Sequence, residues 1–164
     1  MDNQSSFRRA QEKDLKEIVE LCEFVKKTYP LWNEYYPIYD NFLEDYQNNL
    51  LFVLEVSGKI IGSIGAEKSN WHENTLTLHL FMIHPEYRNQ GYGTKLFQNT
   101  EKLLAKEGET QIDLLVRNDN VKAMKMYRTL GYQNLGPVKT PWETEDGKFY
   151  FLFVKRISKQ EKNA

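Results

Sequence analysis

Residues 84–94, HPEYRNQGYGT, place Arg88, Gly91 and Gly93 at a junction between two regular segments. A strand-like apolar run, LTLHLFMI, comes just before this stretch, and a helix-like run, KLFQNTEKLLAKEG, comes just after it. A strand that enters a glycine-rich turn and then a helix can bind an anion. The first amides of a helix have no partners within the helix, and the helix dipole adds partial positive charge there. Glycines also let the backbone approach a bulky anion such as a pyrophosphate.

This glycine turn is a weak signal when it is taken alone. The dinucleotide fingerprint Gly-x-Gly-x-x-Gly is absent, because no third glycine follows Gly93 at the required spacing. The Walker A pattern is absent as well. A tight strand-to-helix connection is the commoner explanation for such a turn, and Arg88 would then brace the loop or add charge to it.

A second pattern follows the apolar run IDLLV. Asn120, Ala123 and Tyr127 are spaced by three and four residues, which puts them on one face of a short helix. An asparagine at a helix start can cap the helix or hold an amide-containing ligand. A tyrosine on that face can offer a phenolic proton, although a half-buried packing role is the commoner one for tyrosine.

The bulk composition predicts one domain over residues 1–164, large enough to bury a sizeable core. Lys and Arg number 22 against 23 Asp and Glu, which gives no reason to expect a nucleic-acid or membrane partner. The one cysteine excludes a disulfide within the chain. The first residues are polar, and no apolar run reaches the roughly 20 residues of a membrane span, so we expect a soluble, cytoplasmic protein.

Hydrophobic periodicity predicts a mixed α+β fold with the order β-α-α-β-β-β-α-β-α-β-β, not a regular βαβ repeat. Helices are expected within residues 14–29, after Pro37, after Gly93 and within residues 119–132; strands are expected within residues 7–10, 50–68 (a hairpin turning at Ser57 and Gly58), 73–83, 110–116 and 148–157. Cys22 falls on the apolar face of the first helix, where a core role is preferred over a nucleophilic one.

Both patterns resemble one protein family. LFMIHPEYRNQGYGTKLF is similar to the acyl-CoA-binding motif of the GNAT superfamily of N-acetyltransferases, Arg/Gln-x-x-Gly-x-Gly/Ala, which Arg88, Gly91 and Gly93 fill. VRNDNVKAMKMYRTLGY resembles the motif that follows it in the family, which is filled by Asn120, Ala123, Tyr127, Gly131 and Tyr132. The predicted order of elements also fits the family from end to end. The segment at 28–47 is similar to that of a group of small bacterial members.

The resemblance implies an α+β fold with a central mixed, mostly antiparallel sheet, splayed in the middle and flanked by about four helices. It also implies an acetyl-CoA-dependent N-acetyltransferase. The acetyl group would pass to a primary amine of a small molecule or peptide by direct attack, with no covalent acetyl-enzyme. A non-catalytic acyl-CoA-binding sensor or interaction module is the alternative.

The resemblance further implies how acetyl-CoA, the co-substrate, is bound. Turn amides would hold the pyrophosphate, a bulged strand would pair its backbone with the pantetheine arm, and Tyr127 would be the general acid at the leaving thiolate. The implied acetyl-CoA-binding residues are Phe81, Met82, Ile83, Arg88, Asn89, Gln90, Gly91, Tyr92, Gly93, Thr94, Asn120 and Ala123.

The general base is left open between two residues. Alternation in the strand at 73–83 puts His79 on the face of Thr77 and Phe81, and its ordinary pKa of about 6.5 suits a base. Glu67, late in the preceding strand, is the alternative. For each, a structural or solvated role is the commoner one. His84 is expected to shape the turn or to face the CoA entrance. The histidines lack metal-ligand spacing, so no metal is expected.

Acceptor binding is predicted for the aromatic segment at 28–47. Aromatic walls attract cations and carboxylates pair with ammonium groups, and the candidates are Trp32, Glu34, Tyr35, Tyr36, Tyr39 and Asp40. Core packing of the aromatics and a solvated helix face for the acids are the commoner alternatives. Trp142 would cap the acceptor pocket or pack at a sheet edge. We expect a monomer or a homodimer.

Overall fold

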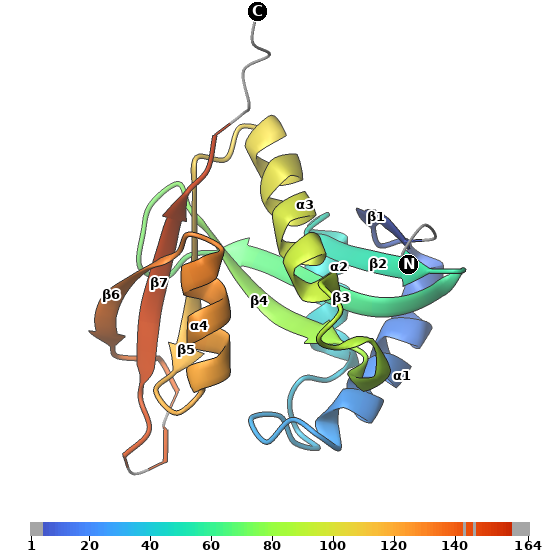
Figure 1. Cartoon of the computed structure of the whole chain (residues 1–164), viewed down its shortest axis with the longest axis horizontal. Helices are drawn as coiled ribbons and strands as arrows, with labels where there is room; N and C mark the ends of the chain where they lie inside the picture. Colours follow the sequence, from blue (N-terminus) through green and yellow to red (C-terminus); the bar gives the residue numbers. More distant parts are fainter. Residues whose placement is uncertain (1–4, 143, 146, 159–164) are drawn as a thin grey trace, which may run out of the picture. The chain divides into compact units, whose positions relative to one another are not determined.

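The computed structural model describes residues 5–142, 144–145 and 147–158. The elements run in the order β1 (Ser5–Arg9), α1 (Leu15–Lys26), α2 (Tyr39–Gln47), β2 (Leu51–Val56), β3 (Lys59–Lys68), β4 (Leu76–Ile83), α3 (Tyr92–Lys106), β5 (Gln111–Arg117), α4 (Val121–Thr129), β6 (Gln133–Val138) and β7 (Tyr150–Arg156) (Figure 1). Short 3₁₀ turns precede α1 and α3. This order confirms the predicted mixed α+β fold with four α-helices.

The chain forms two compact units that interleave in the sequence. The first comprises the residues up to Glu67 together with His79–Thr100, and the second comprises Lys68–Leu78 together with the residues from Glu101 onward. The strands follow the order β1-β2-β3-β4-β5-β7-β6. The pairings β1–β2, β2–β3, β5–β7 and β6–β7 are antiparallel, while β4–β5 is parallel over two residue pairs. The mostly antiparallel sheet is therefore confirmed, and one domain over residues 1–164 stays a prediction.

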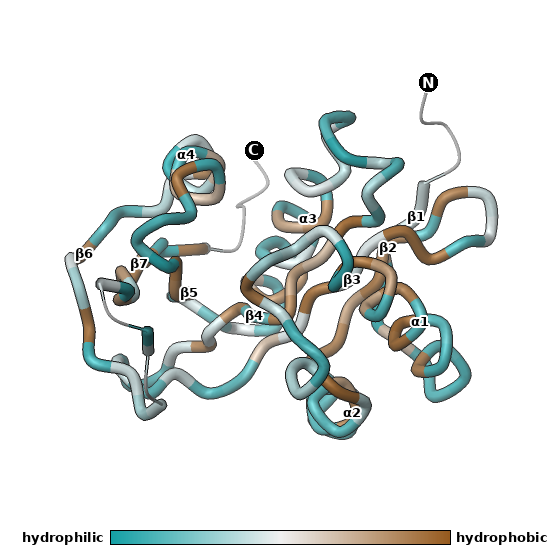
Figure 2. The backbone as a smooth tube through the Cα atoms, turned by 90° about the horizontal axis from the view of Figure 1, so that it is seen from below, coloured by the Kyte–Doolittle hydropathy of each residue, from teal (hydrophilic) through white to brown (hydrophobic). Residues whose placement is uncertain are grey.

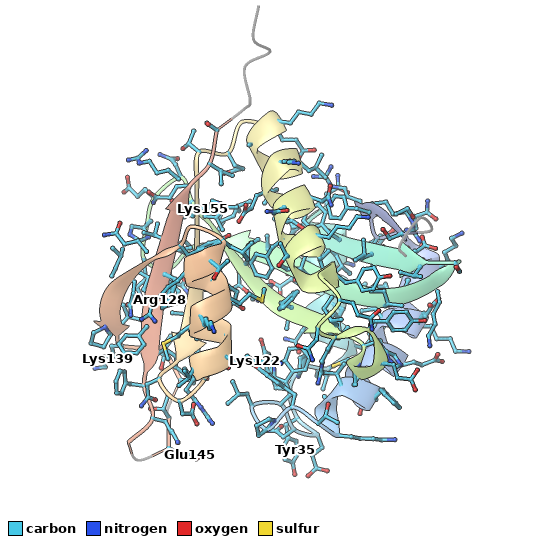
Figure 3. All side chains as sticks on the ribbon, in the orientation of Figure 1. Tyr35, Lys122, Arg128, Lys139, Glu145 and Lys155 are labelled. Atoms are coloured by element: carbon cyan, nitrogen blue, oxygen red, sulfur yellow. The ribbon has the colours of Figure 1, made fainter. Side chains whose placement is uncertain are left out.

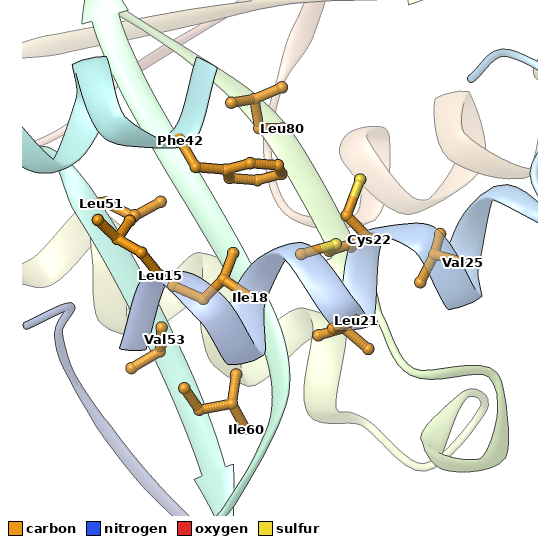
Figure 4. Close-up of a cluster of buried hydrophobic side chains, with 11 residues drawn as sticks. Leu15, Ile18, Leu21, Cys22, Val25, Phe42, Leu51, Val53, Ile60 and Leu80 are labelled. Atoms are coloured by element: carbon orange, nitrogen blue, oxygen red, sulfur yellow. The ribbon is translucent and has the colours of Figure 1, made fainter. Parts of the chain in front are cut away.

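The core of the first unit lies between α1, α2 and the strands. Apolar residues recur once per turn along α1, as the brown and teal sides of its tube show in Figure 2. Figure 4 shows these side chains with Phe42 of α2 and Leu80 of β4; the buried cluster is Leu15, Ile18, Leu21, Cys22, Val25, Phe42, Leu51, Val53, Ile60, Leu80 and Met82. Burial raises the pKa of Cys22 to about 11, which keeps it a thiol and confirms the core role.

A β-bulge interrupts β4 and corrects the predicted alternation. Leu80 has a φ of 52°, in the left-handed region that costs a non-glycine residue about 1–2 kcal/mol. Strict alternation would place His79 and Leu80 on opposite faces. Instead, His79 contacts Asp45 of α2, and Leu80 packs in the same core cluster as Phe42 of α2. The bulge therefore directs two consecutive side chains toward α2, whereas Phe81 meets Phe97 of α3 edge-on, so the strict alternation predicted through His79, Leu80 and Phe81 is wrong.

A buried carboxylate anchors the β3–β4 loop in the second unit. Asp113 of β5 is fully buried and accepts hydrogen bonds from the hydroxyls of Ser69 and Thr77, and its Oδ2 lies 3.0 Å from Nδ1 of His72. Buried charges are tolerated when hydrogen-bond donors surround them in this way. Asp113 thus fixes residues at both ends of the loop that leads into β4.

We expect Asp113→Ala to lower the free energy of unfolding by about 2 kcal/mol. The substitution leaves the hydroxyls of Ser69 and Thr77 without their acceptor and creates a cavity. Urea denaturation measures this change. Asp119→Ala is the matched control, since Asp119 forms exposed ion pairs with Arg117 and Lys148 and should lose less than about 1 kcal/mol. Equal losses in the two variants would contradict the anchoring role of Asp113.

Among the described residues, the structure contains no helix that is both long enough and apolar enough to cross a membrane.

Candidate active site

The glycine turn of the first unit joins the end of β4 to α3. The amide of Lys95 donates to the carbonyl of Gly91 at 3.0 Å, so α3 begins directly after the glycine turn and its N-terminus faces that turn. Gly91 has a φ of 86°, which favours glycine, and a Cβ there would meet nothing within 4 Å. Backbone conformation, not crowding, therefore requires this glycine. The turn leaves space beside the start of a helix, where an anion is favoured.

Arg88 braces this turn. Its Nε donates to the carbonyl of Ile83 at 3.2 Å, and its guanidinium also donates to the hydroxyl of Thr28 at 3.4 Å. Of the two roles expected for Arg88, the structure therefore shows bracing. Gln90 supports the same loop by donating to the carbonyl of Glu86 at 3.0 Å.

His84 shapes the start of the turn. Its Nδ1 accepts a hydrogen bond from the amide of Glu86 at 3.1 Å, and its ring stacks on Phe24 with centroids 4.8 Å apart. Burial, with help from the charge of Lys59, lowers the pKa of His84 below its ordinary value, so the ring is neutral at neutral pH. These contacts agree with the predicted shaping role.

The second predicted motif lies on α4 in the second unit. Oδ1 of Asn120 accepts a hydrogen bond from the amide of Ala123 at 3.2 Å, so Asn120 caps the helix, which is one of its two predicted roles. Tyr127 is half-buried and meets Tyr132 and Phe153 edge-on, with ring centroids 6.0 and 6.2 Å away. Aromatic packing on two sides restricts the orientation of the Tyr127 ring.

Tyr132, the aromatic residue that ends this motif, has a structural role. Its hydroxyl donates to Glu101 at 2.7 Å, and the same carboxylate accepts from Nζ of Lys155 at 2.8 Å. Burial, followed by the charge of Glu101, raises the pKa of Tyr132 well above its ordinary value. Tyr132 therefore keeps its proton and joins the end of α4 to α3 and β7.

The two candidate bases, His79 and Glu67, lie in one cluster with Asp45, which no sequence pattern indicated as a site residue. Nε2 of His79 lies 2.7 Å from Oδ2 of Asp45, and Nδ1 of His79 lies 2.5 Å from Oε2 of Glu67. The side chains come from α2, β3 and β4. We call Asp45, His79 and Glu67 the acid–histidine triad.

The two contacts determine the protonation of His79. Burial alone would lower the pKa of His79, but the hydrogen bonds with Asp45 and Glu67 outweigh it and raise the pKa to about 9. Burial raises the pKa of Asp45, whereas the hydrogen bond from His79 lowers the pKa of Glu67. His79 is thus an imidazolium at neutral pH and is poorly placed to accept a further proton. Glu67, with 47% of its side chain exposed, is the ionised member open to solvent.

The structure separates the predicted acceptor residues. Trp32 meets Tyr29 edge-on at 5.2 Å and packs against the core of the first unit, so the core alternative describes it better than an acceptor wall. Tyr35 is 78% exposed in the loop between α1 and α2, where Figure 3 labels it. Tyr39 lines a surface hollow with residues of the start of α1. The remaining predicted residues Glu34, Tyr36 and Asp40 are exposed.

Trp142 of the second unit lies at the edge of the sheet. Its ring meets Tyr150 edge-on with centroids 5.7 Å apart, and with Phe149 it lines an open surface hollow. This contact fits the edge-packing alternative. The described residues contain no group of three or more His, Cys, Asp or Glu side chains arranged to hold a metal ion.

Comparisons with known proteins agree with the two motifs. The family model described as Acetyltransferase (GNAT) family matches residues 14–132. The chain is 30% identical over 120 residues to an acetyltransferase of Sodalis glossinidius, covering 73% of this chain and 81% of that protein. It is 28% identical over 123 residues to an acetyltransferase of Yersinia enterocolitica, covering 75% and 84%.

Solved structures show the same fold. The ribosomal-protein-S18-alanine N-acetyltransferase of Escherichia coli matches with a TM-score of 0.75 and 21% identity, covering 98% of each chain. The Salmonella typhimurium protein yncA, solved with its cofactor acetyl-CoA, matches with a TM-score of 0.76 and 17% identity, also covering 98% of each chain. At these identities the likeness establishes the fold alone.

These findings define the class of protein. The chain belongs to the GNAT acetyltransferase family. It is therefore an acyltransferase, as its two motifs predict.

Proposed function

We propose that this enzyme transfers the acetyl group of acetyl-CoA to a primary amine of a small molecule or a peptide by direct attack. The observation that carries the proposal is the turn after β4, where the bulge at Leu80, the left-handed Gly91 and the N-terminus of α3 follow one another. Strained backbone conformations of this kind persist mainly where function requires them.

The residues of the turn suit the anionic end of acetyl-CoA. The amides from Arg88 to Thr94 would hold the pyrophosphate, and Arg88 keeps the turn in shape through Ile83 and Thr28. The backbone of Phe81, Met82 and Ile83 would pair with the pantetheine arm, with Asn120 and Ala123 at the start of α4 as further contacts. Acetyl-CoA supplies the reactive thioester; the chain supplies orientation and proton transfer.

Two side chains would move the protons in this reaction. The amine must be neutral to attack the thioester carbon, so Glu67 takes one proton from the ammonium, directly or through a water molecule. A carbon–nitrogen bond forms, the carbon–sulfur bond breaks, and the hydroxyl of Tyr127 gives a proton to the departing thiolate. The nitrogen then loses its second proton, which restores the Tyr127 hydroxyl through solvent, and Glu67 releases the first proton to water. Glu67 is preferred over His79 because both ring nitrogens of His79 already face carboxylates.

The experiment that tests this function is CoA release from acetyl-CoA in the presence of polyamines, aminoglycosides, amino acids and short peptides. Amine-dependent release of CoA, with the acetylated amine identified by mass spectrometry, supports the proposal. CoA binding without release, across a panel that includes peptides with free N-termini, would favour an acyl-CoA sensor instead.

The exposed acids of the aromatic segment provide a test of acceptor binding. We expect the double charge reversal Glu34→Lys with Asp40→Lys to raise the KM for a cationic acceptor about 5-fold, since exposed ion pairs contribute up to about 1 kcal/mol. The KM for acetyl-CoA should stay constant. The matched control is Glu73→Lys, an exposed acid of the second unit. An acceptor KM that is unchanged in the double variant would remove these acids from the acceptor site.

A further inference from the structure

The acid–histidine triad contains a carboxylate that the proposed reaction does not yet use. Asp45 is 3% exposed, lies in the second half of α2, and directs Oδ2 at Nε2 of His79. Moving a carboxylate out of water costs several kcal/mol, so a buried ion pair contributes little net stability compared with apolar packing. Its presence beside a candidate base therefore calls for a functional explanation.

The backbone of β3 makes room for this carboxylate. A Cβ placed on Gly65 would lie 1.9 Å from Oδ2 of Asp45 and 3.3 Å from the ring of His79. Any side chain at this position would push Asp45 away from the histidine. Two elements thus contribute to the same contact: α2 supplies the carboxylate of Asp45, and β3 supplies a glycine, Gly65, that leaves room for it.

Hydrogen-bond chemistry links Asp45 to Glu67 through the ring. Carboxylate oxygens only accept hydrogen bonds, so both contacts of His79 are hydrogen bonds only when both ring nitrogens carry protons. A neutral imidazole can donate to one carboxylate and must release the other. Since Asp45 is buried and Glu67 is half exposed, loss of the second proton would free Glu67 to move.

On the basis of the proposed function, we infer that Asp45 is a positioning residue: it holds His79 as an imidazolium, and the imidazolium fixes the carboxylate of Glu67 for proton abstraction from the acceptor amine. Neither Asp45 nor His79 touches the substrate in this assignment. The charged groups that face His79 are Asp45 from α2 and Glu67 from β3, while Glu44 of α2 adds negative charge near Asp45.

The inference predicts a pH-dependent defect in Asp45→Asn. At pH 6 His79 is protonated with or without Asp45, so kcat should fall less than about 3-fold. At pH 8.5 the wild-type ring keeps its second proton but the variant ring loses it, so kcat should fall about 10-fold while the KM for acetyl-CoA stays constant. Glu44→Gln, which removes the neighbouring exposed acid of α2, should match the wild type at both pH values.

The titration of the His79 ring nitrogens, followed by NMR, tests the geometry without any turnover. The wild type should titrate near pH 9, and both Asp45→Asn and Gly65→Ala should lower this pKa by at least about one unit. Gly65→Ala keeps the charge of Asp45 and displaces it by steric contact, so a shared effect identifies the contact itself. Circular dichroism confirms that each variant is folded.

The outcomes separate the inference from the proposed function. Turnover that falls equally at pH 6 and pH 8.5 in Asp45→Asn, or a His79 pKa that does not move, would overturn the positioning role and leave acetyl transfer intact. A wild type that titrates as expected but acetylates no amine would overturn the proposed function and the positioning role with it.

Discussion

Tyr127→Phe is expected to lower kcat about 100-fold, because general acid catalysis commonly contributes 10²–10⁴-fold and the departing thiolate would lose its proton donor. The ring should stay in place, since the edge-on contacts with Tyr132 and Phe153 do not involve the removed hydroxyl. The KM for acetyl-CoA should therefore change less than about 3-fold. Steady-state CoA release gives both constants.

Tyr132→Phe is the matched control on the same segment. Its hydroxyl donates to Glu101, so its removal should lower the free energy of unfolding by about 1–2 kcal/mol and leave kcat of the folded enzyme nearly unchanged. An equal loss of kcat in the two variants would assign Tyr127 to packing. A full kcat in Tyr127→Phe would require another donor for the thiolate.

Glu67→Gln is expected to lower kcat/KM for the acceptor about 100-fold, because the amide cannot take the ammonium proton. Acetyl-CoA affinity, measured by calorimetry, should remain within about 3-fold of the wild type because Glu67 is assigned to the acceptor side. The fold should be retained, since nearly half of the Glu67 side chain is exposed and its carboxylate pairs with His79 at the protein surface.

His79→Asn is the comparison that decides between the two candidate bases. If Glu67 is the base, His79→Asn removes only the positioning contact. It should lower kcat/KM for the acceptor about 10-fold, a smaller loss than in Glu67→Gln. A larger loss in His79→Asn than in Glu67→Gln would return the role of base to His79. Measuring both variants at pH 6 and 8.5 separates positioning from proton transfer.

Local sequence patterns predicted most of the architecture. The apolar spacing of α1 and of α3 requires one buried face on each helix, and the alternating and continuous apolar runs require strands. Arg88, Gly91 and Gly93, followed by Asn120 and Tyr127, were enough to identify the family. These features depend on residues within one or two turns of each other, so they can be read from neighbouring positions in the chain.

The same local patterns could not supply roles that depend on distant contacts. Strict alternation was expected along β4, but the bulge at Leu80 leaves both His79 and Leu80 directed toward α2. For Trp32 the sequence left open an acceptor wall or core packing, and its contacts with Tyr29 and the core cluster favour the core. Asp113 was read as part of an apolar strand, although it anchors a loop about 40 residues away in sequence.

The sequence by itself determined the order of elements, the buried Cys22, the glycine turn and the family. Only the tertiary structure showed that Asp45 is the buried carboxylate that contacts His79. Asp45 and His79 are separated by 34 positions, and their contact requires α2 to pack beside β4, the bulge to redirect His79 and Gly65 to leave space. No periodicity encodes a contact of that kind, because it arises where three elements meet and requires that Gly65 carry no side chain.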